Sequence, residues 1–363
     1  MIRRQLILFD GYSTDYRVGA GALGDLARLF KGLVTRPKRA VMVLDGSVSA
    51  SLRERVEVDL AASDFAVTVS DLSAADDIAT IEQAADLQRS FAAVGLTADD
   101  AVVAVGGREV AAVVMFAART WCGGTAVAIV PTTLDAMATV ATTMRGLDAG
   151  EAQEAVSVPA HAALVVCDTD LVCSVPADER ALGLVCMTGS ILTESRRAWD
   201  RYLELVSGLV AGDAEDTLSA LAATQTARAA VLKAANPSAR AALGFGCTTS
   251  RALANLLGDA LTPAQYLTEG IRFESRLAHD ALDFPVDDVF ALDDALFDLG
   301  FDEPAFELDA QSLVDAIRSE RFSNSNRFML PLPHTVGSLR LATVEDDVLL
   351  AHARAYLDAR AER

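Results

Sequence analysis

A pair of glycines, Gly106-Gly107, follows an apolar run at residues 101–105 and precedes a stretch with helical periodicity. Because glycine has no Cβ, the backbone N–H groups of such a turn can approach a pyrophosphate closely. A second apolar run, residues 126–130, ends in Pro131-Thr132-Thr133-Leu134. The order strand, diglycine turn, helix, strand predicts a site for a nucleotide or a phosphate at this turn.

Arg108 follows the glycine pair directly. Its side chain would crowd a pyrophosphate if the backbone needed a positive φ or a close approach at this residue. A guanidinium at the same place could instead bind a phosphate through charge-assisted hydrogen bonds. The sequence leaves both interpretations open.

The elements that position this turn alternate between strand and helix. Short apolar runs predict strands at residues 39–44, 65–70, 101–105, 126–130 and 164–167, with helical stretches between most of them. The longest helical stretch, residues 77–94, is followed by Gly95, which we expect to end it as a C-cap. Strands that are apolar throughout imply a parallel sheet covered by helices on both faces.

Beyond Pro176 the pattern changes to helices separated by loops rich in Gly, Pro and Asp. The expected helices are residues 179–196, 199–210, 214–233, 250–257, 263–278 and 311–319, with a late strand pair at 327–331 and 339–343. The predicted fold class is therefore α/β, with an N-terminal Rossmann-like parallel-sheet domain at residues 1–176. A mainly α-helical C-terminal domain follows at residues 177–363.

The chain is strongly acidic, with a formal net charge of −20 over 363 residues. This charge argues against non-specific binding of nucleic acid and against docking on an anionic membrane. The five cysteines contain no C-x-x-C pair and do not resemble a disulfide framework. The N-terminus lacks the features of a signal peptide, and no apolar run is long enough to span a bilayer. We therefore expect a cytoplasmic protein.

The chain resembles the 3-dehydroquinate synthase family of sugar-phosphate cyclases over almost its whole length. Six segments match the family in the correct order: residues 16–21, Gly106-Gly107, Pro131-Thr132-Thr133-Leu134, residues 168–176, Gly183 and residues 240–248. The resemblance implies that NAD binds the first domain and that the second domain holds zinc. It also implies a seven-carbon keto-sugar phosphate as substrate and a homodimer formed through the first domain.

The family binds its zinc through a glutamate and two histidines, and none of these is present here. The resemblance places Cys186 at the glutamate position, Cys247 at the first histidine position and residues 262–264 at the second. We therefore predict that zinc is absent and that small apolar side chains fill its place. Thiolates are good zinc ligands, so a softer site built on Cys186 and Cys247 is the alternative. Cys186 lies in what we expect to be a buried helix stripe, where an apolar setting raises a thiol pKa.

Other family positions are partly kept. The resemblance makes Asp45, Asp76, Thr132, Thr133 and Glu179 candidate cofactor-binding residues, together with Gly106, Gly107 and Arg108. It makes Arg145, Arg228 and Arg240 candidate clamps for a substrate or phosphate, and Arg321 a further one. Several phosphate-binding lysines of the family are replaced, so the substrate site resembles the family only in part.

Three functions follow from these observations. The first is a dehydroquinate synthase-like pseudoenzyme that no longer runs the zinc- and NAD-dependent cyclisation but retains nucleotide or phosphate binding. A role in regulating a shikimate-pathway protein would follow from kinship alone. The second is an active 3-dehydroquinate synthase or another NAD-dependent enzyme of the superfamily, a carbon–oxygen lyase with an altered site. The third is a dimeric interaction protein without a ligand.

Overall fold

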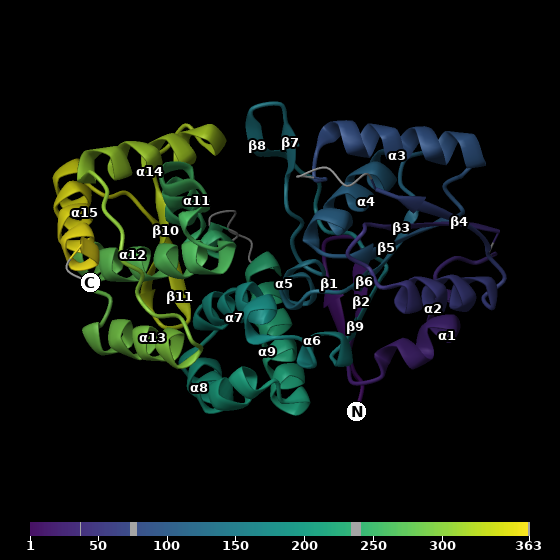
Figure 1. Cartoon of the computed structure of the whole chain (residues 1–363), viewed down its shortest axis with the longest axis horizontal. Coiled ribbons are helices and arrows are strands. Elements are labelled where there is room, and N and C mark those ends of the chain that lie inside the picture. The colour runs from purple at the N-terminus through teal and green to yellow at the C-terminus, as the bar shows by residue number, and fades with distance from the viewer. Residues whose placement is uncertain (37, 73–77, 234–240, 362–363) are drawn as a thin grey trace. The chain divides into compact units, whose positions relative to one another are not determined.

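The computed structural model describes residues 1–36, 38–72, 78–233 and 241–361. The chain divides into two compact units (Figure 1). The first unit contains Met1–Pro176 and Thr217–Gln225, and the second contains Ala177–Asp216 and Thr226–Arg363. The sequence-based division at Pro176 does not include Thr217–Gln225 in the first unit.

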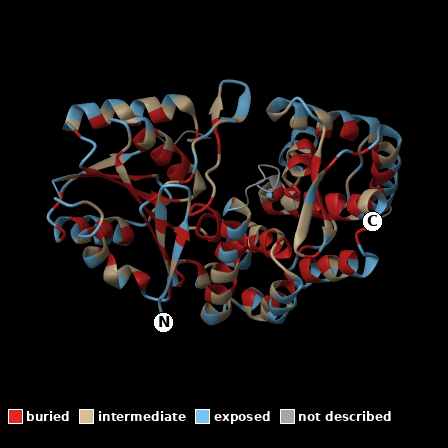
Figure 2. Cartoon of the chain, turned by 180° about the vertical axis from the view of Figure 1, so that it is seen from behind, coloured by how far each residue is buried: buried red, intermediate tan, exposed pale blue. Residues whose placement is uncertain are grey.

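A seven-stranded sheet forms the centre of the first unit. Its strands lie in the order β1 (Arg3–Leu8), β2 (Ser13–Gly19), β9 (Leu164–Asp168), β6 (Ala126–Pro131), β5 (Ala101–Gly106), β3 (Arg39–Leu44) and β4 (Ala66–Asp71). All neighbours from β2 to β4 are parallel, and only the edge strand β1 is antiparallel. The apolar runs β3, β5, β6 and β9 are buried almost completely (Figure 2). The predicted Rossmann-like parallel sheet is therefore confirmed.

Short helices and one hairpin complete the first unit. The helices are α1 (Leu26–Phe30), α2 (Ala50–Ala61), α3 (Ile81–Val94), α4 (Arg108–Thr120), α5 (Leu134–Thr139) and α6 (Asp170–Cys173), with a 3₁₀ turn at Ala22–Asp25. Strands β7 (Leu147–Ala149) and β8 (Ala152–Val156) form a hairpin that the sequence did not predict. Its short polar strands lack the apolar run that marks a buried strand.

The longest predicted helix of this unit, α3, shows how local chemistry sets its ends. It begins at Ile81 because the Thr80 side chain accepts a hydrogen bond from the Gln83 amide and so caps the helix. Gly95 has a φ of 66° and ends the helix, as expected from the sequence. The expected start at residue 77 lies outside the described residues, but residues 78–80 are described and are not helical, so the predicted helix begins too early.

Helices dominate the second unit. They are α7 (Ala177–Leu192), α8 (Arg196–Ala211), both ends of α9 (Ala214–Lys233), α11 (Cys247–Leu257), α12 (Pro263–Leu282), α13 (Val286–Asp298), α14 (Ala310–Asn324) and α15 (Asp346–Ala361). Short 3₁₀ turns lie at Ala241–Gly244 and Gly258–Ala260, and β10 (Leu330–Thr335) pairs with β11 (Ser338–Ala342). The single helix predicted at residues 179–196 is wrong, because it ends at Leu192 and Ser195 caps a new helix.

Helix α12 is the centre of the second unit. It packs against α7, α11, α13, α15 and β10. Most of its residues are buried, including the charged residues Glu269, Arg272 and Glu274. Buried charges must be paired or hydrogen-bonded to be tolerated, so α12 organises polar contacts as well as apolar packing. Among the described residues, no helix is long and apolar enough to cross a bilayer.

Candidate functional site

The diglycine turn lies where the order of strands in the sheet reverses. From β3 the chain moves outward to β4, and it then returns to the other side of β3 to add β5 and β6. In open α/β sheets, the carboxyl ends of the strands at such a point form the usual ligand crevice. Asp45 follows β3 and Gly106 ends β5, so both residues lie at this point.

Gly106 and Gly107 form a tight junction between β5 and α4. Gly106 has a φ of 153°, and a Cβ added to it would lie 2.7 Å from Val110 Cγ2. A glycine is therefore required here by the local packing as well as by the backbone conformation. Gly107 is the N-cap residue of α4, and because glycine has no side chain, it provides no side-chain acceptor for the first N–H groups of the helix. This is the arrangement that binds anions at helix N-termini.

The end of β6 lies beside this junction. The Thr132 amide donates a hydrogen bond to the Gly106 carbonyl at 3.0 Å. The Thr133 hydroxyl caps α5 by accepting from the Ala136 amide at 3.4 Å. The structure therefore brings together Gly106, Gly107, Thr132 and Thr133, as the sequence predicted, but Thr133 is already engaged as a cap.

Asp45 is also engaged locally. Its Oδ1 accepts hydrogen bonds from both the amide and the hydroxyl of Ser47, at 2.8 and 2.5 Å. This turn fixes the carboxylate at the end of β3, and its second oxygen has no hydrogen bond from a described residue. Asp45 therefore presents a carboxylate at the end of β3, and its role in binding a ribose stays a prediction.

Arg108 begins α4 with a helical backbone, so the condition of a positive φ for crowding a pyrophosphate is not met. Its Nε lies 3.9 Å from Asp135 Oδ2, and both side chains are half-buried. The guanidinium is thus compensated in part by a carboxylate at the start of α5. That compensation reduces its value as a phosphate ligand.

Glu109 is a residue of this site that the sequence analysis missed. It lies in the first turn of α4, and a Cβ added to Gly107 would come within 3.2 Å of its Oε2. A carboxylate at a helix N-terminus is attracted by the same amides that would bind a phosphate. Glu109 therefore competes with an anionic ligand. An acidic residue two positions after the glycine pair was the signal that could have revealed it.

The remaining cofactor and clamp candidates are dispersed. Asp76 and Arg240 lie outside the described residues. Glu179 is exposed in the first turn of α7 and belongs to the second unit. Arg321 is half-buried on α14, where its Nε is buried and donates no hydrogen bond to a described residue.

Two predicted clamps are held by contacts inside their own units. Arg145 lies 3.1 Å from Glu154 Oε1 and 3.6 Å from Asp148 Oδ2, in the hairpin of β7 and β8. Two carboxylates therefore offset its charge, which weakens its attraction for a phosphate. Arg228 is buried, and its Nη1 donates to the Ser190 hydroxyl at 2.9 Å, which ties α9 to α7.

The family's three metal positions do not offer a zinc donor set. Cys186 on α7 is half-buried rather than part of a buried stripe, and Cys247 is the half-buried first residue of α11. At the third position, the Thr262 hydroxyl caps α12 in a capping box with Gln265, and Pro263 and Ala264 have no donor side chain. Among the residues that the structure describes, no group of three or more His, Cys, Asp and Glu side chains could hold a metal ion. These residues do not fit the family's zinc, and its absence stays a prediction.

A buried carboxylate that the sequence analysis missed lies beside Cys247. Glu274 accepts hydrogen bonds from the Gly246 amide at 2.7 Å, the Thr249 amide at 3.3 Å and the Thr249 hydroxyl at 3.0 Å. Burial raises the pKa of Glu274 to about 7, although these donors oppose the shift. The N-terminus of α11 is therefore already occupied by an internal carboxylate.

The sequence is similar to known 3-dehydroquinate synthases. The family model for the N-terminal part of 3-dehydroquinate synthase matches residues 69–181. The enzyme of Symbiobacterium thermophilum is 29% identical over 250 residues, covering 66% of this chain and 68% of that enzyme. The enzyme of Thermobifida fusca is 32% identical over 179 residues, covering 48% of this chain and 47% of that enzyme. The match to the second relative thus spans about half of its length.

Solved structures with the same fold include two sugar-phosphate cyclases. A 2-deoxy-scyllo-inosose synthase complexed with carbaglucose-6-phosphate, NAD⁺ and Co²⁺ has a TM-score of 0.85 and 17% identity, covering 97% of this chain and 100% of that one. The 2-epi-5-epi-valiolone synthase of Streptomyces hygroscopicus subsp. jinggangensis, with NAD⁺ and Zn²⁺ bound, has a TM-score of 0.81 and 18% identity, covering 99% of both chains. At these identities the likeness establishes the fold.

Proposed function

The chain belongs to the dehydroquinate synthase-like superfamily, and from this we propose that it binds NAD at the Gly106-Gly107 turn without catalysing a zinc-dependent cyclisation. It would then act as a nucleotide-binding pseudoenzyme. A homodimer formed through the first unit and the binding of a small phosphorylated ligand remain predictions from the family resemblance.

The nucleotide half of this proposal rests on the first unit. The amides at the start of α4, which have no N-cap side chain as acceptor, would hold the pyrophosphate, and Asp45 would hold a ribose. The two similar cyclase structures contain NAD⁺. When bound, NAD supplies a hydride acceptor.

The loss of cyclisation is supported by the metal positions in the second unit. The one observation that carries it is the third position, where the start of α12 is closed by the Thr262–Gln265 capping box and offers no side chain for a metal. Three protein ligands are the usual minimum for a catalytic zinc. The internal pairing of Arg145 with Glu154 points the same way, because it offsets a charge that the family uses for substrate.

A second candidate function is an active cyclase or other NAD-dependent enzyme of the superfamily. It is favoured by the half-buried thiols of Cys186 and Cys247, since thiolate is a strong zinc ligand. An enzyme of this kind would need a third ligand from a source other than the family position.

The nucleotide site can be tested through Glu109. Removing its charge with Glu109→Gln should tighten NAD binding about fivefold, because the carboxylate no longer competes with the pyrophosphate for the start of α4. Isothermal titration calorimetry of NAD against wild type and variant measures this change. Glu82→Gln is the matched control, since Glu82 occupies the first turn of α3.

The proposal predicts that Glu82→Gln binds NAD as the wild type does. Unchanged NAD affinity in Glu109→Gln would show that the pyrophosphate does not lie at α4. If neither protein binds NAD at millimolar concentration, the result would favour the third function, a dimeric interaction protein without a ligand.

A further inference from the structure

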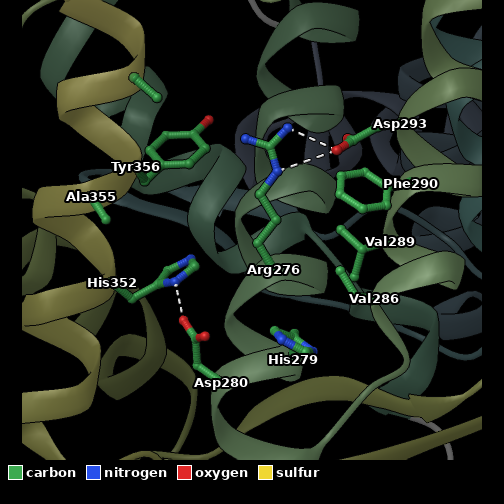
Figure 3. Close-up of a pocket in the computed structure, with 11 residues that line it drawn as sticks. Arg276, His279, Asp280, Val286, Val289, Phe290, Asp293, His352, Ala355 and Tyr356 are labelled. Atoms are coloured by element: carbon green, nitrogen blue, oxygen red, sulfur yellow. Dashed lines mark hydrogen bonds and ion pairs between the residues drawn. The ribbon is translucent and has the colours of Figure 1, made fainter.

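A cavity of about 330 Å³ lies within the second unit, between α12, α13 and α15 (Figure 3). None of the residues predicted to bind nucleotide, substrate or metal lines it. Its volume is within the range of small-molecule sites in proteins. The residues that shape it are Arg276 and Asp280 of α12, Val289 and Phe290 of α13, and His352 and Tyr356 of α15.

One wall of the cavity is an exposed aromatic surface. Phe290 is 60% exposed although it is a large apolar side chain, and it lies with Val286 and Val289 along the side of α13 that faces the cavity. Ala355 and Ala359 of α15 also line it. A cavity bordered by uncovered apolar side chains favours a ligand with an apolar body.

The arginine in the cavity is paired with two carboxylates of the protein. Arg276 Nη2 donates to Asp293 at 2.8 Å and to Glu303 at 2.5 Å, and its Nε donates to Asp293 at 3.3 Å. These two carboxylates raise the pKa of Arg276 against the opposing effect of burial. Its positive charge is therefore compensated within the protein.

The carboxylate of Asp280 differs from the guanidinium of Arg276 because its charge is compensated only in part. It is 48% exposed, and its Oδ2 lies 2.8 Å from His352 Nδ1. No described residue forms a hydrogen bond with its Oδ1. Burial lowers the pKa of His352, although the hydrogen bond to Asp280 opposes this shift. Above neutral pH the ring is therefore uncharged, and Asp280 retains a net negative charge at the edge of the cavity.

We propose that this cavity binds a small organic ammonium ion with an aromatic or apolar body. The ammonium group pairs with Asp280, and the body packs against Phe290. The net charge of −20 on the chain favours the approach of cations. This site is separate from the proposed nucleotide site and does not depend on it.

The pH dependence of binding follows from the same contacts. His352 Nε2 also lies 3.1 Å from the Phe273 carbonyl, so the ring can donate to both of its oxygen neighbours only when it is doubly protonated. As pH rises and the ring loses its proton, Asp280 loses a compensating charge and binds the ammonium ion more tightly. The other charged or titratable groups lining the cavity are Arg276 and His279 of α12, Asp293 of α13 and Tyr356 of α15.

The test uses calorimetry on the full chain with 2-phenylethylamine and, as an uncharged analogue, 2-phenylethanol. The amine should bind at least about tenfold more tightly than the alcohol. Asp280→Asn and Phe290→Ala should each weaken amine binding about tenfold. Because the pKa of His352 is lowered, the rise in affinity should occur as pH increases from about 5 to about 7, and Asp280→Asn should remove it. Phe297→Ala is the matched control, because Phe297 is a 63% exposed phenylalanine of α13 that does not line the cavity.

Equal binding of amine and alcohol would overturn the proposal, as would an equal loss of affinity in Phe297→Ala and Phe290→Ala. No amine binding at 10 mM, a concentration corresponding to a very weak site, would also overturn it. Light scattering of the same variants tests whether a second copy of the chain, rather than a small ligand, occupies the cavity. If Phe290→Ala dissociates an oligomer that Phe297→Ala leaves intact, a second copy of the chain covers the cavity and the proposal is wrong.

Discussion

Replacing Arg360 with alanine should lower the free energy of unfolding by about 3 kcal/mol, because it removes one partner of a buried ion pair. Arg360 lies on α15 and is fully buried. Its Nε lies 2.6 Å from Glu269 Oε2 and its Nη1 lies 3.1 Å from Glu303 Oε2. The guanidinium also stacks over the ring of Tyr356 at 4.5 Å. Urea denaturation followed by circular dichroism measures the effect.

The buried carboxylate of Glu269 explains the size of the destabilisation expected for Arg360→Ala. Glu269 is fully buried on α12, with Arg272 at 2.8 Å and the Tyr356 hydroxyl as its other partners. Removing Arg360 leaves this carboxylate with less compensation although its side chain is fully buried. Arg354→Ala is the control, since Arg354 is exposed on the same helix. An equal and small loss in both variants would show that the pair does not stabilise the second unit.

Replacing Glu274 with alanine should destabilise the protein by about 2–4 kcal/mol, because it leaves buried donors without an acceptor and opens a cavity. The donors are the amides of Gly246 and Thr249 at the start of α11. The same denaturation experiment measures this loss. A loss of unfolding free energy smaller than that caused by Glu204→Gln, a substitution at an exposed residue, would contradict the capping role of Glu274.

The pKa of Glu274 adds a pH dependence with a defined sign. Burial raises its pKa from the ordinary value of 4.5 to about 7 in the folded chain. Between these values the unfolded chain releases a proton that the folded chain keeps, so the stability from Glu274 is present at low pH and is lost as pH rises. The difference in unfolding free energy between wild type and Glu274→Gln should therefore shift by about 3 kcal/mol between pH 4.5 and 8. Glu204→Gln should show no such shift.

The sheet and its turn could be predicted from the sequence because their signals are local. Strands buried on both faces are continuous apolar runs, as at Ala101–Gly106 and Ala126–Pro131. Gly106 and Gly95 mark backbone conformations that other residues adopt at a cost. The order of these signals, together with the family resemblance, was sufficient for the fold class.

The polar interior of the second unit could not be predicted, because its partners are distant in sequence. Arg360 and Glu269 are 91 residues apart, and Glu274 and Gly246 are 28 residues apart. In a helical pattern a charged residue is read as facing solvent, so Glu269, Glu274 and Arg360 carry no local sign of burial. Their roles depend on which helices pack against α12.

Arg145 shows a second reason why the site could not be predicted fully from the sequence. The family resemblance assigns this position to substrate, but Asp148 and Glu154 in the unpredicted hairpin of β7 and β8 pair with the guanidinium. The hairpin consists of short polar strands, which have no apolar alternation to reveal them. A site residue carried over from a family can therefore be reassigned by a local element that the sequence does not reveal.

Zinc stoichiometry tests the central claim most directly. The purified protein is incubated with NAD and excess zinc and then desalted, and its zinc content and its phosphate release from the family's seven-carbon keto-sugar phosphate are measured. We expect far less than one zinc ion per chain and no phosphate release, with the same result for Cys186→Ala and Cys247→Ala. One zinc ion per chain that is lost in either cysteine variant, together with phosphate release by the wild type, would contradict the claim.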